Sequence, residues 1–155
     1  MRSLSKQADV VIAIDPGSDK CGVAVVRRDG HILCRAVIDA HELHETIRDL
    51  LTRYKLAVFV LGDRTGSRWA LSVLARCCGE GGGPGTEVFL VDEHLTSVEA
   101  RRRYLKEHPG RGITRFIPAG LRVPDRPYDD YVAIILAERF FAGKWKEKLI
   151  LPGPI

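Results

Sequence analysis

The sequence predicts a single α/β domain built on a mixed, five-stranded sheet with helices on both faces. Three short apolar runs, separated by turn-forming residues, occupy the first part of the 155-residue chain. Beyond them, apolar runs alternate with stretches of helical periodicity, which is the pattern of β–α units. The length suits one core, and neither a linker nor an internal repeat divides the chain. We therefore expect residues 1–155 to form one domain.

The first three predicted strands are joined by short turns. Residues 9–15 (DVVIAID) are nearly all apolar and β-branched, which is typical of a strand buried on both faces. Turn residues at 16–19 end this strand, and the next strand covers 22–26. Arg28-Asp29-Gly30 predicts a hairpin, because Asp-Gly supplies the positive φ angles of a tight turn. With a third strand over 31–37, these segments form an antiparallel meander.

Alternating helices and strands follow the meander. The apolar residues of each predicted helix recur at three- and four-residue spacing, and each strand is a short apolar run. The predicted elements are a helix over 43–54, a strand over 56–61, a helix that starts at Ser67, a strand over 88–91, a helix that starts at Ser97 and a last helix over 128–141. Residues 144–155 carry no strong signal. The order βββ-α-β-α-β-α-α is characteristic of the ribonuclease-H-like fold.

Capping patterns mark two of the helix starts. Thr96-Ser97-Val98-Glu99 is a T-x-x-E capping box, and Asp39 with Glu42 gives a similar start to the helix over 43–54. After the capped helix, residues 107–126 contain three prolines and three glycines and show no clear period. Loops of this length are uncommon and usually functional or mobile. We therefore predict a mobile basic loop over 107–126.

Positive charge is concentrated in one segment of the chain. The net charge is +4, and between Glu99 and Arg126 there are eight basic residues against three acidic ones. The excess within this segment is larger than that of the whole chain, so the remainder is about neutral. A basic segment either contacts a polyanion such as nucleic acid or forms a solvated surface, and charge alone favours neither.

The composition also indicates the cellular compartment in which the protein is expected. No apolar run is long enough to span a bilayer, and the N-terminus lacks the apolar segment and cleavage site of a secretory signal. We expect a cytoplasmic protein that does not contact the membrane. The four cysteines show no C-x-x-C spacing, which favours core thiols over zinc ligands.

Three carboxylates stand at the ends of predicted elements. Asp15 ends the first strand, Glu93 follows the fifth, and Asp129 lies in the first turn of the last helix. Ligands collect at the carboxyl ends of parallel strands, so we expect these side chains to meet at one edge of the sheet. Taken alone, each is more often a structural turn, loop or helix-start residue than a functional one. Together they need a cation, and Mg²⁺ or Mn²⁺ suits oxygen ligands.

The five histidines form no recognisable catalytic set with serine, cysteine or aspartate. His94, next to Glu93, is the histidine nearest the predicted site. We treat it as a candidate for assisting with a phosphate or a proton, beside the alternative that it is a loop residue.

Three segments of the chain resemble the YqgF/RuvX family, which is related to the RuvC Holliday-junction resolvases. Residues 12–24 resemble the family's opening strand, D-x-G-x-x-x-x-G-V-A, with an Asp-Pro-Gly form closer to that of RuvC. Asp92–Ala100 (DEHLTSVEA) resembles D-E-R-L-T-T-V-E-A and is the most specific match. Residues 129–141 resemble the closing helix, which begins D-x-x-x-A. The chain departs from the pattern at His94, where the family has arginine, in the loop 62–67, and in the long loop 107–126.

The resemblance implies a metal-dependent nuclease whose acidic triad is Asp15, Glu93 and Asp129, with Asp130 a rival for the third place. Two Mg²⁺ or Mn²⁺ ions, bridged by Asp15 and held by Glu93 and Asp129, would activate a water and stabilise the leaving oxygen. Basic side chains outside the triad would hold nucleic-acid phosphates. The candidates for this role are Arg101, Arg102, Arg103, Arg111, Arg115 and Arg122.

Substrate and function class remain open at this point. The resemblance implies either maturation of ribosomal RNA precursors or cleavage of branched DNA. Symmetric cutting of a four-way junction needs a homodimer, but the sequence reveals no dimer face, so monomer and homodimer both stand. A non-catalytic nucleic-acid-binding module is the first alternative, although such a module has no need of the carboxylates. A nucleotide-binding domain of the actin and sugar-kinase type is the second, and 155 residues leave no room for the partner domain that it requires.

Overall fold

The structure, a computed structural model, describes residues 9–54, 58–64, 66–81, 85–110, 116 and 126–151. In chain order the elements are β1 (Val10–Asp15), β2 (Lys20–Arg27), β3 (Ile32–Asp39), the 3₁₀ helix η1 (Ala40–Glu42), α2 (Leu43–Arg53), β4 (Val58–Gly62), α3 (Ser67–Gly81), β5 (Thr86–Val91), α4 (Thr96–Glu107), α5 (Asp129–Phe141) and β6 (Glu147–Leu151). None of the helices in these ranges has the length and apolar character needed to cross a membrane. Most of the predicted basic loop over 107–126 lies outside the described residues.

The strands form one mixed sheet in the order β3-β2-β1-β4-β5-β6. β1, β2 and β3 make the predicted antiparallel meander. β4 pairs in parallel with both β1 and β5. Because β1, β4 and β5 run in the same direction, their carboxyl ends lie at one edge of the sheet, and this edge carries the candidate site.

The described residues form six strands, so the prediction of five was wrong. The additional strand is β6, which pairs antiparallel with the edge of β5. Its sequence, EKLIL, begins with two charged residues, and Ile150 is 64% exposed although it is apolar. An edge strand of five residues with this composition shows neither a clean alternation nor a continuous apolar run, which are the two patterns that mark a strand in sequence.

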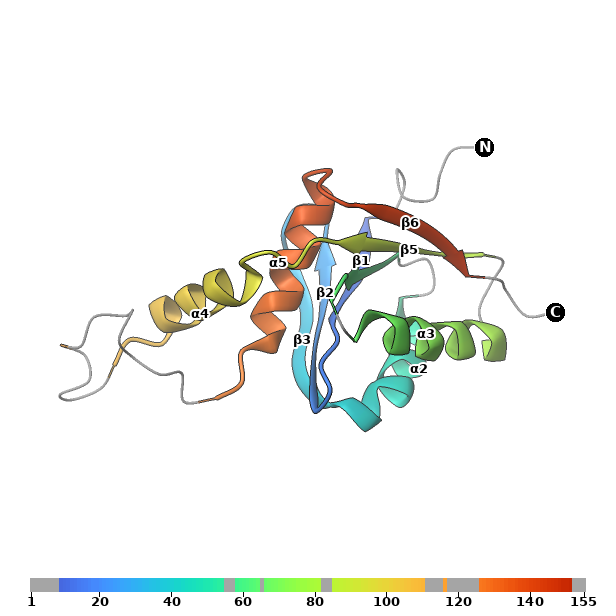
Figure 1. Cartoon of the computed structure of the whole chain (residues 1–155), viewed down its shortest axis with the longest axis horizontal. Helices are drawn as coiled ribbons and strands as arrows, with labels where there is room; N and C mark the ends of the chain where they lie inside the picture. Colours follow the sequence, from blue (N-terminus) through green and yellow to red (C-terminus); the bar gives the residue numbers. More distant parts are fainter. Residues whose placement is uncertain are drawn as a thin grey trace.

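Helices cover both faces of the sheet, as predicted (Figure 1). Val11 and Ala13 of β1 face a core shared with α4 and α5, whereas Ile12 and Ile14 face a second core shared with α2 and α3. Burial on both faces explains why 9–15 is a continuous apolar run. Figure 1 also shows α4 extending away from the sheet, next to α5.

The start of α4 differs from its prediction. The helix begins at Thr96, one residue early, and the capping box does not form. Leu95 occupies the N-cap position in the left-handed region, with φ 59°, and makes no side-chain cap. Thr96 instead donates its hydroxyl to the Glu93 carbonyl oxygen at 2.8 Å, while Glu99 accepts a hydrogen bond from Arg103 at 2.7 Å. The helix start is therefore fastened to the residue that precedes it, not to its own first turn.

The predicted cap at the other helix is also absent. Asp39 makes no side-chain cap and instead forms an ion pair with Lys20 of β2.

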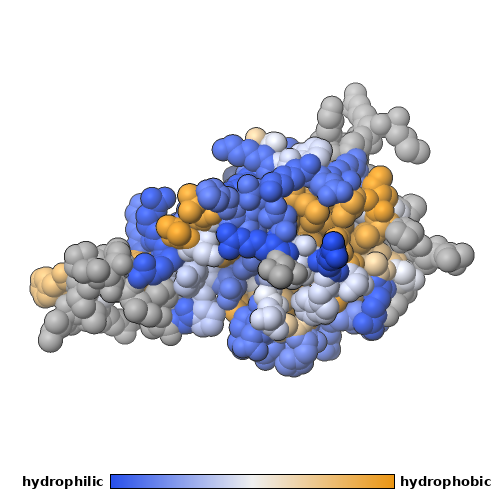
Figure 2. Space-filling view, viewed as in Figure 1, coloured by the Kyte–Doolittle hydropathy of each residue, from blue (hydrophilic) through white to orange (hydrophobic). Residues whose placement is uncertain are grey.

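The surface seen in Figure 2 is mainly hydrophilic, with hydrophobic residues gathered over the start of α4, where Leu95 and Val98 are exposed, and between β6 and α3.

Candidate active site

The three predicted carboxylates line one cleft at the carboxyl edge of the sheet. Asp15 is the last residue of β1, Glu93 follows β5 by two residues, and Asp129 is the first residue of α5. The cleft has a volume of about 770 Å³. Its walls are completed by Pro16, Gly17, Ser18, Ala40, Arg64, Gly66, Trp69 and Ser97.

A glycine allows α5 to start against the sheet. Gly22 of β2 lies opposite Asp15 in the antiparallel pair. A Cβ atom at Gly22 would lie 1.9 Å from the backbone oxygen of Asp129, which no real packing tolerates. The absence of a side chain at Gly22 therefore lets Asp129 approach the end of β1.

A second glycine makes room for Glu93. A Cβ atom at Gly62, the last residue of β4, would lie 2.4 Å from the carboxyl group of Glu93. Because position 62 has no side chain, the Glu93 carboxyl can lie across the end of β4. It is almost completely buried there, at 3% exposed.

Proximity and burial change the protonation of the carboxyl groups. Burial, followed by a hydrogen bond to Glu93 and the charges of Glu93 and Asp129, raises the pKa of Asp15 to about 9, and the nearby charge of Arg64 opposes this rise. Burial, with the charge of Asp130 added, also raises the pKa of Asp129. Without a cation, the arrangement is therefore accommodated by keeping a proton between Asp15 and Glu93.

These residues fit a hard divalent cation. Among the described residues that line the cleft, Arg64 is the one cation facing three carboxyl groups. Carboxylate oxygens are the ligands that Mg²⁺ and Mn²⁺ prefer. A bound ion would take the place of the proton that the raised pKa keeps on Asp15 beside Glu93. The side chains that would hold it are Asp15, Glu93 and Asp129.

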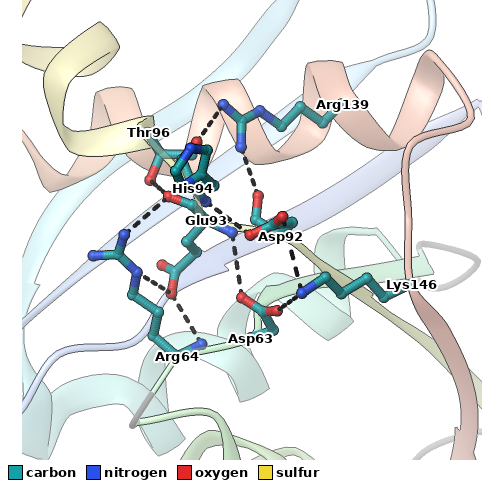
Figure 3. Close-up of polar contacts among 8 residues, drawn as sticks. All are labelled: Asp63, Arg64, Asp92, Glu93, His94, Thr96, Arg139 and Lys146. Carbon is teal, nitrogen blue, oxygen red and sulfur yellow. Dashed lines mark hydrogen bonds and ion pairs between the residues drawn. The ribbon is translucent and has the colours of Figure 1, made fainter.

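Several contacts fix the backbone and carboxyl group of Glu93 (Figure 3). The Arg64 backbone N–H donates to Glu93 Oε2 at 3.0 Å, and Arg64 Nη2 donates to the Glu93 carbonyl oxygen at 3.3 Å. The Glu93 N–H donates to Asp63 Oδ1 at 3.2 Å, and Thr96 holds the carbonyl from the other side. Glu93 is thus positioned through both its main chain and its side chain.

Residues from α5 and from the segment before β6 hold the neighbouring loop. Lys146 Nζ pairs with Asp63 Oδ2 at 2.8 Å and lies 3.9 Å from Asp92 Oδ2. Arg139 donates to the carbonyl oxygens of Asp92, at 2.6 Å, and His94, at 2.9 Å. Partial burial disfavours ionisation of Asp63, but the hydrogen bonds from Lys146 and from the Glu93 N–H outweigh it and lower the pKa of this carboxyl.

Asp63 and Arg64 were not among the residues predicted for the site. Both follow β4 directly, and β4 ends at the same edge as β1 and β5. The rule that led to Asp15 and Glu93 could therefore have found them. Arg139 and Lys146 offer no such signal, because their contacts depend on the long-range packing of α5 and β6.

Asp130, the rival for the third place, lies elsewhere. It is 3% exposed and lines a separate hollow. There it accepts hydrogen bonds from Arg35 Nε at 2.9 Å and from Arg126 Nη1 at 3.3 Å. Of the two neighbouring aspartates, it is Asp129 that the structure brings to the cleft.

The other predicted site residues are dispersed. His94 is exposed in the β5–α4 loop and is not among the residues that line the cleft. Arg103 donates hydrogen bonds to Glu99 on its own helix, α4, and to Glu138 on the neighbouring α5. Its guanidinium group therefore links the two helices. Arg102 is exposed and Arg101 is half-buried on α4. Arg111, Arg115 and Arg122 lie outside the described residues.

A second group of ligand atoms lies near η1. Within the described ranges, Asp39, His41 and Glu42 are the group of three whose ligand atoms lie within 4.8 Å of one another. They are half-buried or exposed, and Asp39 already pairs with Lys20. We therefore regard them as a surface group against which the cleft can be tested.

Comparison with known proteins supports the fold. No protein-family model matches the sequence, and a search of curated protein sequences finds no match. Among solved structures, the chain is similar to Thermus thermophilus RuvC in complex with a Holliday junction substrate, with a TM-score of 0.56 and 20% identity over 88% of this chain and 98% of that chain. A second structure of Thermus thermophilus RuvC gives a TM-score of 0.54 and 19% identity over the same shares. The chain thus has the ribonuclease-H-like α/β fold of RuvC.

Proposed function

We propose that this protein is a metal-dependent endonuclease that hydrolyses phosphodiesters in structured nucleic acid. The observation that carries the proposal is the convergence of Asp15, Glu93 and Asp129 along one cleft, where burial, a hydrogen bond to Glu93 and the charges of Glu93 and Asp129 disfavour the ionised form of Asp15. A non-catalytic module has no need of three carboxyl groups in one cleft, where burial disfavours the ionised forms of Asp15 and Asp129.

The chain's own residues supply the ligands and the support for this chemistry. Asp15, Glu93 and Asp129 would hold Mg²⁺ or Mn²⁺, which supplies Lewis-acid catalysis of phosphodiester hydrolysis when bound. Arg64 keeps Glu93 in place through its backbone N–H, while its side chain remains 57% exposed at the cleft. That exposed guanidinium is available to a substrate phosphate.

Two substrates follow from different observations. Similarity in fold to a RuvC structure that holds a Holliday junction supports branched DNA. The resemblance of Asp92–Ala100 to the YqgF/RuvX pattern supports a ribosomal RNA precursor. We place the four-way DNA junction first, because that likeness extends over most of the chain. Symmetric cutting would require a homodimer, since each active site cuts one strand.

The test is a cleavage assay with both substrates, in Mg²⁺ and in Mn²⁺. We expect the wild type to cut one of them, and Asp15→Asn to bind that substrate normally without cutting it. Asp9→Asn is the matched control, because Asp9 precedes the other end of β1 and its side chain is 81% exposed. Binding by the wild type without cleavage in either metal would overturn the nuclease and favour the non-catalytic module.

A further inference from the structure

A second polar hollow lies beside the candidate active site. It has a volume of about 470 Å³ and is lined by Lys20 of β2, Arg35 of β3, and Arg126 and Asp130 at the start of α5. Asp129 lines the cleft and its neighbour Asp130 lines this hollow. The two sites therefore lie on either side of the first turn of α5.

The charges in the hollow do not balance. Arg35 and Arg126 both bond to the single carboxylate of Asp130. Lys20 forms its ion pair with Asp39, which is exposed and outside the hollow. Two guanidinium groups facing one carboxylate leave one positive charge in excess, and a phosphodiester carries one negative charge.

Aromatic rings hold the two guanidinium groups in place. Arg35 lies over the ring of Tyr131, 4.1 Å from its centroid, and Arg126 lies over Tyr104 at 5.0 Å. Stacking of this kind fixes the plane of the guanidinium and leaves its N–H groups free to bond at the edge. Arg35 Nη2 is shielded from solvent and has no hydrogen-bond partner among the described residues. A buried donor of this kind is costly to leave unpaired, so the floor of the hollow keeps an unmet hydrogen-bond donor and an excess of positive charge.

From these contacts we propose that the hollow lined by Lys20, Arg35 and Arg126 binds a backbone phosphate of the nucleic acid, next to the phosphate that is cleaved. The proposal rests on the proposed nuclease function. Arg126 and Lys20 carry the exposed charges that meet the phosphate, while Arg35 and Asp130 form the floor that orients them. No base is read, so the contact is independent of sequence.

The first test measures binding in an Asp15→Asn background, so that the substrate stays intact. Lys20→Gln and Arg126→Gln are compared with Arg53→Gln, which likewise removes an exposed, ion-paired positive charge, from α2 on the other face of the sheet. Arg35 still faces Asp130 in Arg126→Gln, so the floor of the hollow is kept. Fluorescence anisotropy is recorded over a salt series with the four-way junction and with precursor RNA in separate arms.

We expect Lys20→Gln and Arg126→Gln each to weaken binding about tenfold at low salt, as the loss of one charge-assisted contact does. Each should also reduce the slope of log affinity against log salt by about 0.9 on DNA. Arg53→Gln should behave like the parent. Equal effects of all three variants would overturn the hollow as a phosphate site and reduce it to general positive charge.

A second test locates the phosphate. Single phosphates of the bound strand are replaced in turn by neutral methylphosphonates. If the hollow holds one phosphate, one replacement close to the cleaved bond weakens binding by the parent and adds nothing to Arg126→Gln. Additive effects at every position would contradict the proposal.

The two proposals fail in different ways. Unchanged binding by Lys20→Gln and Arg126→Gln in the Asp15→Asn background, together with unchanged cleavage by the same two variants when Asp15 is kept, would remove the phosphate site and leave the nuclease standing. No binding by the parent to either nucleic acid would remove both.

Discussion

Two glycines determine how closely the carboxylates of the cleft can approach one another. At Gly62, an added Cβ atom would lie 2.4 Å from the side-chain carboxyl group of Glu93. At Gly22, an added Cβ atom would lie 1.9 Å from the backbone carbonyl oxygen of Asp129. The Glu93 side chain can rotate away from an added methyl group, whereas the backbone at the start of α5 cannot. The two substitutions to alanine should therefore have different consequences.

Gly62→Ala should lower cleavage about a hundredfold, because a displaced carboxylate misplaces the reacting groups by about an ångström. Its free energy of unfolding should change little. Gly22→Ala should instead destabilise the fold by about 3 kcal/mol, the upper end of overpacking costs. Chemical denaturation and cleavage rates measured on both variants check this. Equal loss of stability in the two would contradict the distinction.

The raised pKa of Asp15 predicts how stability depends on pH in the absence of metal. Asp15 ionises near pH 3.8 when unfolded, but folding raises this pKa to about 9. Between these values the folded state binds more protons than the unfolded state, so the stabilising contribution of the Asp15 proton falls as pH rises through this window.

Asp15→Asn should therefore be more stable than the wild type at pH 8 by at least about 1.4 kcal/mol, the worth of one pKa unit, because folding of the wild type at this pH has to keep a proton on Asp15 that the unfolded chain has released. At pH 4 Asp15→Asn should be no more stable than the wild type. Urea denaturation in a chelator at both pH values measures the difference. A gain of equal size at pH 4 would show that the pKa of Asp15 is not the cause.

The main sequence signal for the site was the position of acidic residues at the ends of predicted strands. Asp15 and Glu93 follow apolar runs, so a parallel sheet brings them to one edge. Asp129 was predicted from its place in the first turn of the last helix, and the family resemblance left Asp130 as a rival. Their catalytic role remains a prediction. Arg103 illustrates why surface arginines could not be assigned from sequence: its partner Glu138 lies 35 residues away on α5.

β6 matters to the site because the segment before it supplies Lys146. Lys146 pairs with Asp63, and Asp63 in turn holds the Glu93 N–H. Supporting residues around a metal site typically contribute 10- to 100-fold to metal affinity or activity. An edge strand that contributes no carboxylate to the cleft is thereby coupled to Glu93, one of the carboxylates that line it.

Asp63→Ala should lower cleavage about 10- to 100-fold at limiting Mn²⁺, because Glu93 loses the acceptor for its N–H. Asp63→Asn should recover part of this activity, since its amide oxygen can still accept that hydrogen bond. Cleavage rates over a Mn²⁺ titration separate weaker metal binding from slower chemistry. Identical rates for wild type and Asp63→Ala at all Mn²⁺ concentrations would contradict a positioning role.

Long, strongly patterned elements were predictable from sequence, and the exceptions have physical causes. The meander and the helix–strand alternation appear as expected because their apolar patterns are set by burial on one or both faces. β6 was missed because its partner, β5, is known only from the folded sheet. The capping box at Thr96 does not form because its two side chains make other local contacts: Glu99 pairs with Arg103 four residues later on the same helix, and Thr96 bonds back to the Glu93 carbonyl oxygen.

The topology of the chain explains why residues far apart in the sequence form one acidic cleft. Three parallel strands end at one edge, and α5 returns from the far end of the sequence to start over the same edge. Folding therefore gathers carboxylates that repel one another, and a cation that binds only the folded state should stabilise the entire fold.

Saturating Mn²⁺ should raise the melting temperature of the wild type by about 5–10 °C, because an ion at a hundred times its dissociation constant adds about 2.7 kcal/mol and each kcal/mol shifts a chain of this size by about 2–4 °C. Asp15→Asn should lose most of this shift. Asp39→Asn is the informative control, since Asp39 belongs to the other group of ligand atoms, with His41 and Glu42. Retention of the shift in Asp39→Asn, measured by calorimetry, assigns the ion to the cleft. Loss of the shift in Asp39→Asn alone would instead assign it to the surface group and remove the metal from the proposed mechanism.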